Sequence, residues 1–222
     1  HSGEAVLAEI YPGGFRHNVQ SLRVVDVLES GSTRRGMNLT MEVRDGIVNH
    51  TGSVMPMTPE GQIVKVSDRI AYINHDIDDA IRSGIITIDD LPKESIAILG
   101  DTHKKRIDTL VRDMIENTIG RPTAQLSTEK MEAMNDLRTF MFKNVYHNSR
   151  VKRVEDINKV KEIVEFLYSY YLENHDELPR ELLAMRDEFS IEELVKDHVA
   201  GMTDRYALNT YEELTKNFKR FI

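Results

Sequence analysis

The sequence predicts an all-α fold, and two observations support that prediction. Apolar residues recur at alternating spacings of three and four along the longer segments, a pattern typical of helices that bury one face. No segment forms a convincing β-strand, and the chain contains no internal repeat. With 222 residues, 40% of them hydrophobic, the chain can bury the core of one large domain or two small ones.

Residues that favour helix starts and stops divide the first half of the chain. A short helix is expected to end before the helix-breaking segment Pro12-Gly13-Gly14, and the next helix before Gly31. Thr58 is a candidate N-cap with Pro59 at the first helical position, and together they begin the most strongly predicted helix, which runs to Arg82. The expected helices of this half cover residues 4–10, 17–29, 40–49 and 59–82.

Longer helical segments dominate the second half. Gly120-Arg121-Pro122 separates the first two of them, and Ser190 with Glu193 makes a capping box that begins a later helix. The apolar stripe of segment 151–174 indicates a core position or an oligomer interface. The expected helices cover residues 103–119, 128–148 and 151–174, followed by a helix from Ser190 toward Gly201 and a last one at the chain end.

Segment 59–82 has two different faces. Its apolar stripe consists of Ile63, Val66, Ile70, Ile73 and Ile77. At roughly 100° per residue, a polar set falls on the opposite side: Asp68, Tyr72, His75, Asp76 and Asp79. A solvated polar face is the simplest interpretation of this set. The alternative is a binding face.

Composition limits the classes of function. The net charge of −8 gives no broad basic footprint for duplex nucleic acid, although local basic clusters leave nucleic-acid binding open. With no cysteine, any metal must be held by histidine and carboxylate, and the composition suits a reducing cytoplasm. No membrane-spanning run or signal segment occurs, and neither a Gly-Lys-Ser phosphate loop nor a dinucleotide fingerprint is present. Because His1 is not Met, we expect the chain to be part of a longer polypeptide.

Three clusters in the first half could carry chemistry. His1 and Glu4 place an imidazole and a carboxylate three residues apart, unless His1 is only a frayed chain end. His17 follows a glycine pair that would let the backbone approach a ligand, although it could also be an exposed residue that begins a helix. Asp68 cannot hold a metal alone, but it could complete a site whose other ligands lie elsewhere.

Several longer segments together form a pattern that is far more specific than any short motif: His1-Ser2-Gly3-Glu4, Tyr11 to Asn18 with Gln20 to Val24, Val43 to Ile47, His50-Thr51-Gly52, Glu60 to Val64, Ser67 to Asp79, and Ala200 to Tyr206. These segments resemble the bacterial deoxyguanosinetriphosphate triphosphohydrolase-like enzymes of the HD-domain superfamily. That resemblance implies an HD-domain-like helical bundle and hydrolysis of deoxynucleoside triphosphates, dGTP or several dNTPs, to deoxynucleoside and tripolyphosphate. It also implies a divalent metal, with Mg, Mn, Zn and Fe not distinguished, held by a His, a His-Asp pair and a later Asp.

Matching the family motif residue by residue assigns roles to one face of the predicted 59–82 helix. The resemblance implies that Asp68 is the later metal-binding Asp and that Arg69 faces phosphate oxygens. Tyr72 and Asp76 would then meet the deoxyribose, where Asp76 accepts a sugar hydroxyl and Tyr72 crowds the 2′ position.

The resemblance also assigns catalytic roles near the start of the chain. His1 and Glu4 match a His-carboxylate pair that positions or activates the attacking water, and His17 matches a histidine near the α-phosphate. The remaining metal ligands of the family are expected upstream of His1, because the two His-Asp dipeptides present, His75-Asp76 and His175-Asp176, sit in other contexts. The chain is therefore expected to bind metal poorly and to be inactive alone.

The resemblance further predicts how the chain is organised. Residues 1–100 would form the C-terminal part of the HD phosphohydrolase core, and residues 101–222 a helical region that packs on it. A homo-oligomer is expected, with a possible allosteric nucleotide at Arg23, Arg34, Arg35 or Lys104-Lys105-Arg106, although solvated surface is the plainer interpretation of those charges. The alternative function is a non-catalytic nucleotide-binding or regulatory helical oligomerisation module.

Overall fold

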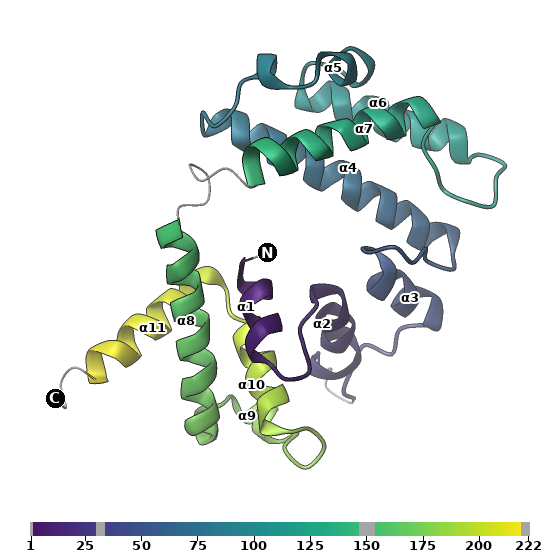
Figure 1. The fold of residues 1–222 in the computed structure, drawn as a ribbon. Coiled ribbons are helices and arrows are strands. Elements are labelled where there is room, and N and C mark those ends of the chain that lie inside the picture. Colours follow the sequence, from purple (N-terminus) through teal and green to yellow (C-terminus); the bar gives the residue numbers. More distant parts are fainter. Residues whose placement is uncertain (1, 30–33, 147–153, 219–222) are drawn as a thin grey trace. The chain divides into compact units, whose positions relative to one another are not determined.

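The computed structural model describes residues 2–29, 34–146 and 154–218, apart from the side chains of residues 154–156, 217 and 218. Every regular element in these ranges is a helix, which confirms the all-α prediction (Figure 1). The chain forms two compact units, the first made of His1–Met37 with Val154–Ile222 and the second of Asn38–Arg153. The division into an HD core over residues 1–100 and a region over residues 101–222 stays a prediction.

The second unit is built around one long helix, α4 (Pro59–Arg82). Helices α3, α6 and α7 pack against α4, and α5 packs against α6 and α7. A π-helical turn, Phe142–Tyr146, continues α7. The bounds of the other helices are α3 (Met41–Asn49), α5 (Lys93–Leu99), α6 (His103–Thr118) and α7 (Thr128–Met141).

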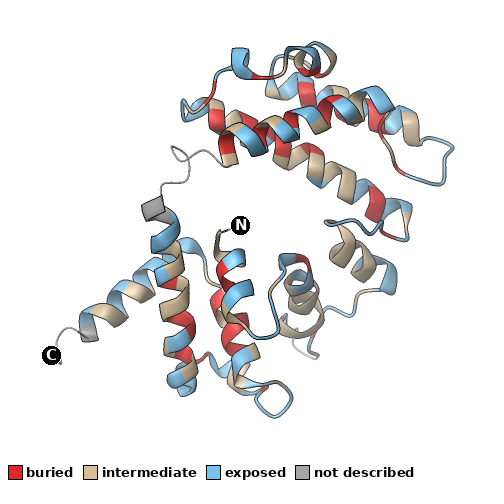
Figure 2. Ribbon diagram, viewed as in Figure 1, coloured by how far each residue is buried: buried red, intermediate tan, exposed pale blue. Residues whose placement is uncertain are grey.

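Helix α4 begins and buries its stripe largely as predicted. The Thr58 side chain accepts a hydrogen bond from the Gly61 backbone N–H at 3.1 Å, which is the expected N-cap. Ile70, Ile73 and Ile77 are at most 2% exposed and lie in the core of the unit, and the buried positions along α4 are drawn in red in Figure 2. These three residues therefore fix which side of α4 faces inward.

Ile63 is the exception in that stripe, because its side chain is 38% exposed. The inward position of the first turn is taken by Gln62 instead. The Gln62 amide donates to the Pro56 carbonyl at 3.0 Å and accepts from the Ala124 backbone N–H at 3.0 Å. A buried amide with both groups paired thus replaces the apolar contact that periodicity predicts.

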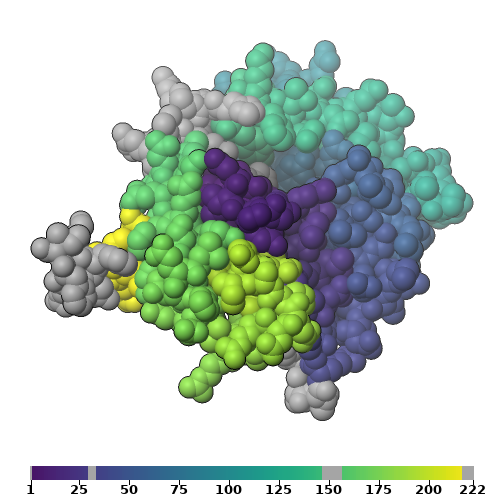
Figure 3. All heavy atoms as spheres, turned by 60° about the horizontal axis from the view of Figure 1, so that its bottom comes forward, coloured from purple at the N-terminus to yellow at the C-terminus, as the bar shows by residue number. Residues whose placement is uncertain are grey.

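The first unit is built around α8 (Val154–Glu173). Helices α1, α10 and α11 pack against α8, and α1 (purple) lies along α8 (green) in Figure 3. A π-helical turn, Val24–Leu28, directly follows α2. The bounds are α1 (Ser2–Ile10), α2 (His17–Arg23), α9 (Arg180–Leu183), α10 (Ile191–Ala200) and α11 (Asp204–Phe218).

The stripe of α8 forms the core of this unit. Ile163, Leu167, Tyr168 and Tyr171 are at most 6% exposed and belong to one cluster with residues of α1 and α10, which confirms the core interpretation for these four residues. Ile157, nearer the start of α8, is 40% exposed.

Several predicted helix bounds need correction. The helix expected over residues 17–29 is α2 followed by a π-helical turn, and the one over 128–148 is α7 followed by another, because pairing changes from i→i+4 to i→i+5. Residues 147, 148 and 151–153 of the predicted helices lie outside the described residues. Two short helices, α5 and α9, were not predicted, and each follows a proline that starts it. No helix among the described residues is long and apolar enough to cross a membrane.

Replacing Ile77 with alanine tests the buried stripe of α4. The Ile77 side chain is 0% exposed, so Ile77→Ala is expected to lower the free energy of unfolding by about 2–5 kcal/mol. Ile63→Ala is the matched control on the same helix and should cost less than about 1 kcal/mol. Urea denaturation measures both, and equal losses would contradict the assigned orientation of α4.

Candidate functional site

The predicted site residues fall in both compact units. Glu4 and His17 belong to the first unit, and His1 lies outside the described residues. The other four, Asp68, Arg69, Tyr72 and Asp76, all lie on α4 in the second unit. The predicted roles of both sets stay predictions.

In the first unit, Glu4 and His17 form a direct pair. The His17 backbone N–H donates to Glu4 Oε1 at 2.8 Å, and His17 Nδ1 lies 2.9 Å from Oε1 and 3.1 Å from Oε2. The sequence paired Glu4 with His1, three residues away. His1 lies outside the described residues, so that pairing stays a prediction, and the structure joins Glu4 of α1 to a histidine thirteen residues later.

A turn between α1 and α2 makes this pair possible. Gly14 adopts a φ of 70°, which glycine tolerates better than other residues, and the turn reverses the chain between the two helices. Arg16 is the N-cap residue of α2 but offers no side-chain cap. Glu4 therefore satisfies one of the unpaired N–H groups at the start of α2 and at the same time orients the imidazole.

The environment of Glu4 favours its charged form. Partial burial raises the pKa of Glu4. The hydrogen bonds from the His17 backbone and ring, together with the charge of His17, lower this pKa by more than burial raises it, so the pKa of Glu4 lies below its ordinary value. The Glu4 side chain is 29% exposed and that of His17 is 47% exposed. A carboxylate and an imidazole are thus held in contact at a position that solvent can reach.

Glu4 also lines a cavity of about 560 Å³ within the first unit. The cavity lies among α1, α8, the end of α10 and α11, and apolar side chains make up most of its wall, among them Leu7, Phe15 and Leu167. The carboxylate of Glu4 is therefore placed between an apolar hollow and the imidazole of His17.

In the second unit, three predicted residues of α4 each meet a side chain from α7 or the π-helical turn that follows it. Arg69 Nη2 donates to Asn135 Oδ1, and Arg138 Nε donates to the Tyr72 hydroxyl at 3.1 Å. The Tyr146 hydroxyl donates to Asp76 Oδ2. This series of three contacts holds the polar face of α4 in defined side-chain conformations.

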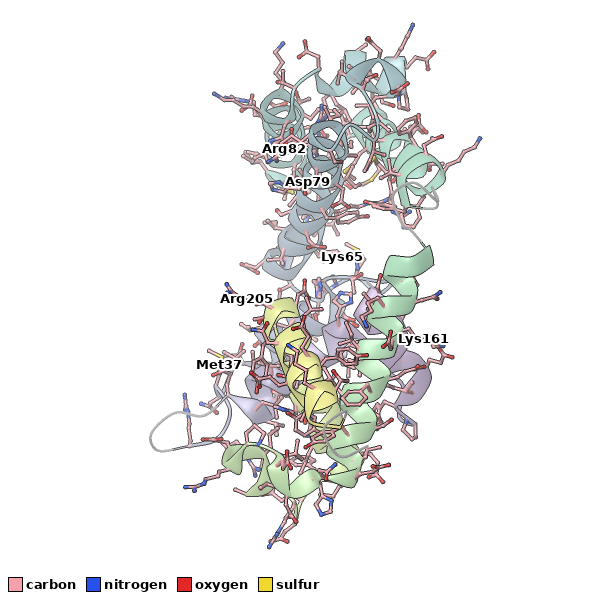
Figure 4. The ribbon with its side chains drawn as sticks, turned by 90° about the vertical axis from the view of Figure 1, so that its left-hand side faces the viewer. Met37, Lys65, Asp79, Arg82, Lys161 and Arg205 are labelled. Carbon is pink, nitrogen blue, oxygen red and sulfur yellow. The ribbon has the colours of Figure 1, made fainter. Side chains whose placement is uncertain are left out.

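Asp76 and Tyr146 line a shallow hollow of about 490 Å³ beside the C-terminal half of α4. Figure 4 shows Asp79 and Arg82, which also line it, near this end of the helix. Burial, and then the hydrogen bond to Asp76, raise the pKa of Tyr146 well above its ordinary value. The tyrosine therefore stays protonated and acts as a donor to the carboxylate.

Asp68 is exposed on α4 one turn after Lys65. The Lys65 ammonium donates to the carbonyls of Asn49, Gly52 and Val54 at 2.9–3.1 Å, and it lies toward the N-terminal end of α4 in Figure 4. Partial burial, and then the charge of Arg69, lower the pKa of Lys65. Lys65 thus ties the loop that follows α3 to the helix that carries Asp68.

The described residues do not fit a complete metal site. No group of three or more histidine, cysteine, aspartate or glutamate side chains in the described ranges is arranged to hold a metal ion. Asp68 would offer a single carboxylate, whereas stable sites use several ligands.

His75 and His175, read as ordinary polar-face residues, have local partners. The His75 ring packs against His103 with centroids 4.9 Å apart, and His175 Nε2 lies 4.0 Å from Asp176 Oδ1. Neither contact involves the predicted site residues.

Two cations that the sequence assigned to solvated surface are not exposed. Arg106 is 1% exposed, and its Nε donates to Asn74 Oδ1 at 2.8 Å. The Arg23 side chain is 13% exposed and pairs with Asp197 and Glu193 of α10. The plainer interpretation of these two charges as solvated surface is therefore wrong, because each is tied to an internal polar partner.

Sequence reasoning did not identify the partners of the α4 residues. Asn135, Arg138 and Tyr146 lie 66–70 residues after the side chains that they contact. The only signal for them in the sequence is that all three are polar residues beside the apolar stripe of one predicted helical segment, 128–148.

Comparisons with known proteins decide the family. A family profile described as a phosphohydrolase-associated domain matches residues 124–213. The chain is 52% identical over 214 residues to the deoxyguanosinetriphosphate triphosphohydrolase-like protein of Caldanaerobacter subterraneus subsp. tengcongensis, covering 96% of this chain and 62% of that protein. It is 33% identical over 271 residues to the protein of the same name from Geobacter sulfurreducens, covering 99% of this chain and 70% of that protein.

The chain belongs to the deoxyguanosinetriphosphate triphosphohydrolase-like family. A third member, from Clostridium perfringens strain 13, is 46% identical and is matched over 64% of its length. The chain thus spans a little under two thirds of this relative and of the one from Caldanaerobacter. Family membership agrees with the resemblance and with the helical fold.

The pH dependence of stability tests the Glu4–His17 pair of this family member. Because the folded-state pKa of Glu4 lies below its unfolded value, its charged form stabilises the fold fully above the ordinary glutamate pKa of about 4.3. This contribution is lost as the pH falls through the lower, folded-state pKa. Glu4→Gln should therefore cost about 1 kcal/mol at neutral pH, and the cost should vanish on acidification.

Urea denaturation between pH 7 and pH 3 measures this difference. The control is Glu9→Gln on the same helix, where Glu9 forms an exposed ion pair with Lys161 at 2.9 Å and little effect is expected at any pH. A cost of Glu4→Gln that did not change with pH would rule out the charged pair.

Proposed function

We propose that this chain is part of a metal-dependent deoxynucleoside triphosphate triphosphohydrolase, which releases deoxynucleoside and tripolyphosphate from dGTP or from several dNTPs. The observation that carries the proposal is the ordered polar face of α4 in a chain of this family, where Arg69, Tyr72 and Asp76 are each held by a hydrogen bond. The chain alone is proposed to be inactive, because the described residues offer only Asp68 as a candidate ligand from the family pattern.

Arg69 is proposed to bind phosphate oxygens. Asn135 accepts a hydrogen bond from one amino group of the Arg69 guanidinium, so the remaining N–H groups of Arg69 can donate to an anion. Arg138, next along α7, adds a second positive charge close to Tyr72. Two cations on one side of the substrate would balance part of the triphosphate charge.

Asp76 and Tyr72 are proposed to recognise the deoxyribose. Tyr146 donates to Asp76 Oδ2, which leaves Oδ1 free to accept a sugar hydroxyl. The Tyr72 hydroxyl accepts from Arg138, so its ring position is fixed and it can crowd the 2′ position. A rigid wall at that position would discriminate against ribonucleotides.

Glu4 and His17 are proposed to act on the attacking water and the leaving oxygen. Glu4 holds Nδ1 of His17, which orients the ring so that Nε2 can exchange a proton with a ligand. His1 is proposed to act with Glu4 on the attacking water, as the resemblance implies. A bound divalent metal would supply Lewis-acid polarisation at phosphorus, with Asp68 as one of its ligands.

Replacing Asp68 tests the proposed reaction. In the full reading frame that contains this chain, Asp68→Ala should abolish tripolyphosphate release from all four dNTPs, because the metal would lose one of its protein ligands. Ion chromatography of the products measures this with Mg²⁺, Mn²⁺, Zn²⁺ or Fe²⁺ present. Asp108→Ala, which removes only an exposed ion pair with Arg112, is the control and should retain activity.

Release of monophosphate or diphosphate by the unmodified protein would reject the proposed bond cleavage. Retained activity in Asp68→Ala would remove Asp68 from the metal role. The 222-residue chain by itself, assayed in parallel, should release no product. A metal-content assay that found one tightly held ion per chain would contradict its proposed inactivity.

Replacing Tyr146 tests the sugar-binding role of Asp76. Tyr146→Phe removes one hydrogen bond to a carboxylate, so kcat/KM for a dNTP should fall roughly 10- to 100-fold. The matched control is Tyr170→Phe, which removes a tyrosine–carboxylate contact to Glu177 in the first unit and should leave kcat/KM unchanged. Steady-state kinetics distinguishes the two, and equal effects would contradict the proposal.

A further inference from the structure

A buried carboxylate on α10, Asp197, is the meeting point of three donors. The Asp197 side chain is 0% exposed. Its Oδ1 accepts from Gln20 Nε2 at 2.9 Å and from Lys196 Nζ at 2.5 Å, and Arg23 Nε lies 3.0 Å from Oδ1 and 2.8 Å from Oδ2. Arg23 Nη2 is also 2.7 Å from Oδ2, as an ion-pair contact without hydrogen-bond alignment.

The charges around Asp197 balance within the first unit. Arg23 pairs also with Glu193 through Nη1 at 2.9 Å, and its guanidinium lies 4.2 Å from the ring centroid of Phe189. Lys196 donates to Gln20 Oε1 at 2.7 Å. Two cations and two carboxylates thus form one largely buried cluster, in which no charge lacks an opposite partner.

Two of these donors come from α2, the helix that begins at His17. Gln20 and Arg23 are three residues apart on α2, so they project from one face of the helix. Helix α2 has only seven residues and its N-cap residue offers no side-chain cap, so its own backbone hydrogen bonds hold it weakly. The side chains of Gln20 and Arg23 that reach Asp197 therefore add to the apolar packing of Val27 and Leu28, in the turn after α2, in fixing its position.

Glu4, the carboxylate that pairs with His17, is held in place by a different set of contacts. It lies on α1, which packs against α8, and α10 packs against α8 as well. The Glu4–His17 contact therefore depends on two connections to α8, the packing of α1 and the path through α10 to α2. In the second path, Asp197 is the residue of α10 that contacts both Gln20 and Arg23, while Glu193 contacts Arg23 alone and Lys196 contacts Gln20 alone.

We infer that Asp197 is a positioning residue for the Glu4–His17 pair, which it holds together by anchoring α2 through Gln20 and Arg23. The catalytic meaning of this role rests on the proposed function, whereas the geometry belongs to this chain alone.

The test uses the 222-residue chain and requires no activity. Asp197→Asn keeps the shape of the side chain but removes its charge, so Arg23 and Lys196 lose their shared carboxylate and α2 should shift. Carbon-detected NMR of the Glu4 carboxyl group should then show its pKa moving upward toward the ordinary value, because His17 no longer donates fully. Amide exchange at His17 should become faster.

A matched control separates this effect from general destabilisation. Glu188→Gln removes a carboxylate from an exposed ion pair with Arg35 in the same unit, and it should leave the Glu4 titration unchanged. If Asp197→Asn does not fold, Gln20→Ala decides, because it removes the hydrogen bonds of Gln20 with Asp197 and Lys196 and leaves Arg23 and Lys196 paired with Asp197. A smaller upward shift of the Glu4 pKa is expected there.

An unchanged Glu4 titration in folded Asp197→Asn, or in Gln20→Ala where that variant decides, would overturn the inference. An equal shift in Glu188→Gln would do the same. Since these readouts need no substrate, failure of the dNTP assay would reject the proposed function and leave the positioning role of Asp197 standing.

Discussion

Burial of the isoleucine stripe of α4 is the constraint on which the rest of the second unit depends. Ile70, Ile73 and Ile77 face the core, so the rotation of α4 about its axis is fixed, and the polar residues between them must face elsewhere. Each buried isoleucine adds roughly 1.5–3 kcal/mol of transfer free energy, which is more than one surface polar contact can provide. Apolar packing therefore sets the direction of Arg69, Tyr72 and Asp76, and the contacts from α7 then select their side-chain conformations.

Periodicity predicted this helix well, because a buried stripe is a local pattern. The Thr58 cap followed from the residue types at the helix start, and the inward isoleucines followed from their spacing. Ile63 is exposed because Gln62 takes the inward position and finds partners for both ends of its amide. The π-helical turns after α2 and α7 left no comparable pattern in the sequence. Their extra residue is accommodated by the pairing of the backbone rather than by residue type.

The candidate site shows more clearly which features the sequence pattern does not predict. The resemblance supplied Glu4, His17 and the α4 residues, but not how they are held. The contacts from Asn135, Arg138 and Tyr146, and the link from His17 to Glu4, join residues 13 to 70 positions apart. Such contacts arise only when helices pack, so a reading of periodicity and motifs cannot locate them. The buried Arg106 and the partly buried Arg23 were misplaced for the same reason.

The charge balance around Asp197 also limits how this family can diverge. Arg23, Glu193, Lys196 and Asp197 sum to zero, and a change of any one of them leaves an unpaired charge in a poorly solvated region. Substitutions at these positions are then acceptable only in compensating pairs, such as a simultaneous loss of one cation and one carboxylate. Across relatives, these four positions should vary together rather than independently, even though 173 positions separate Arg23 from Lys196 along the chain.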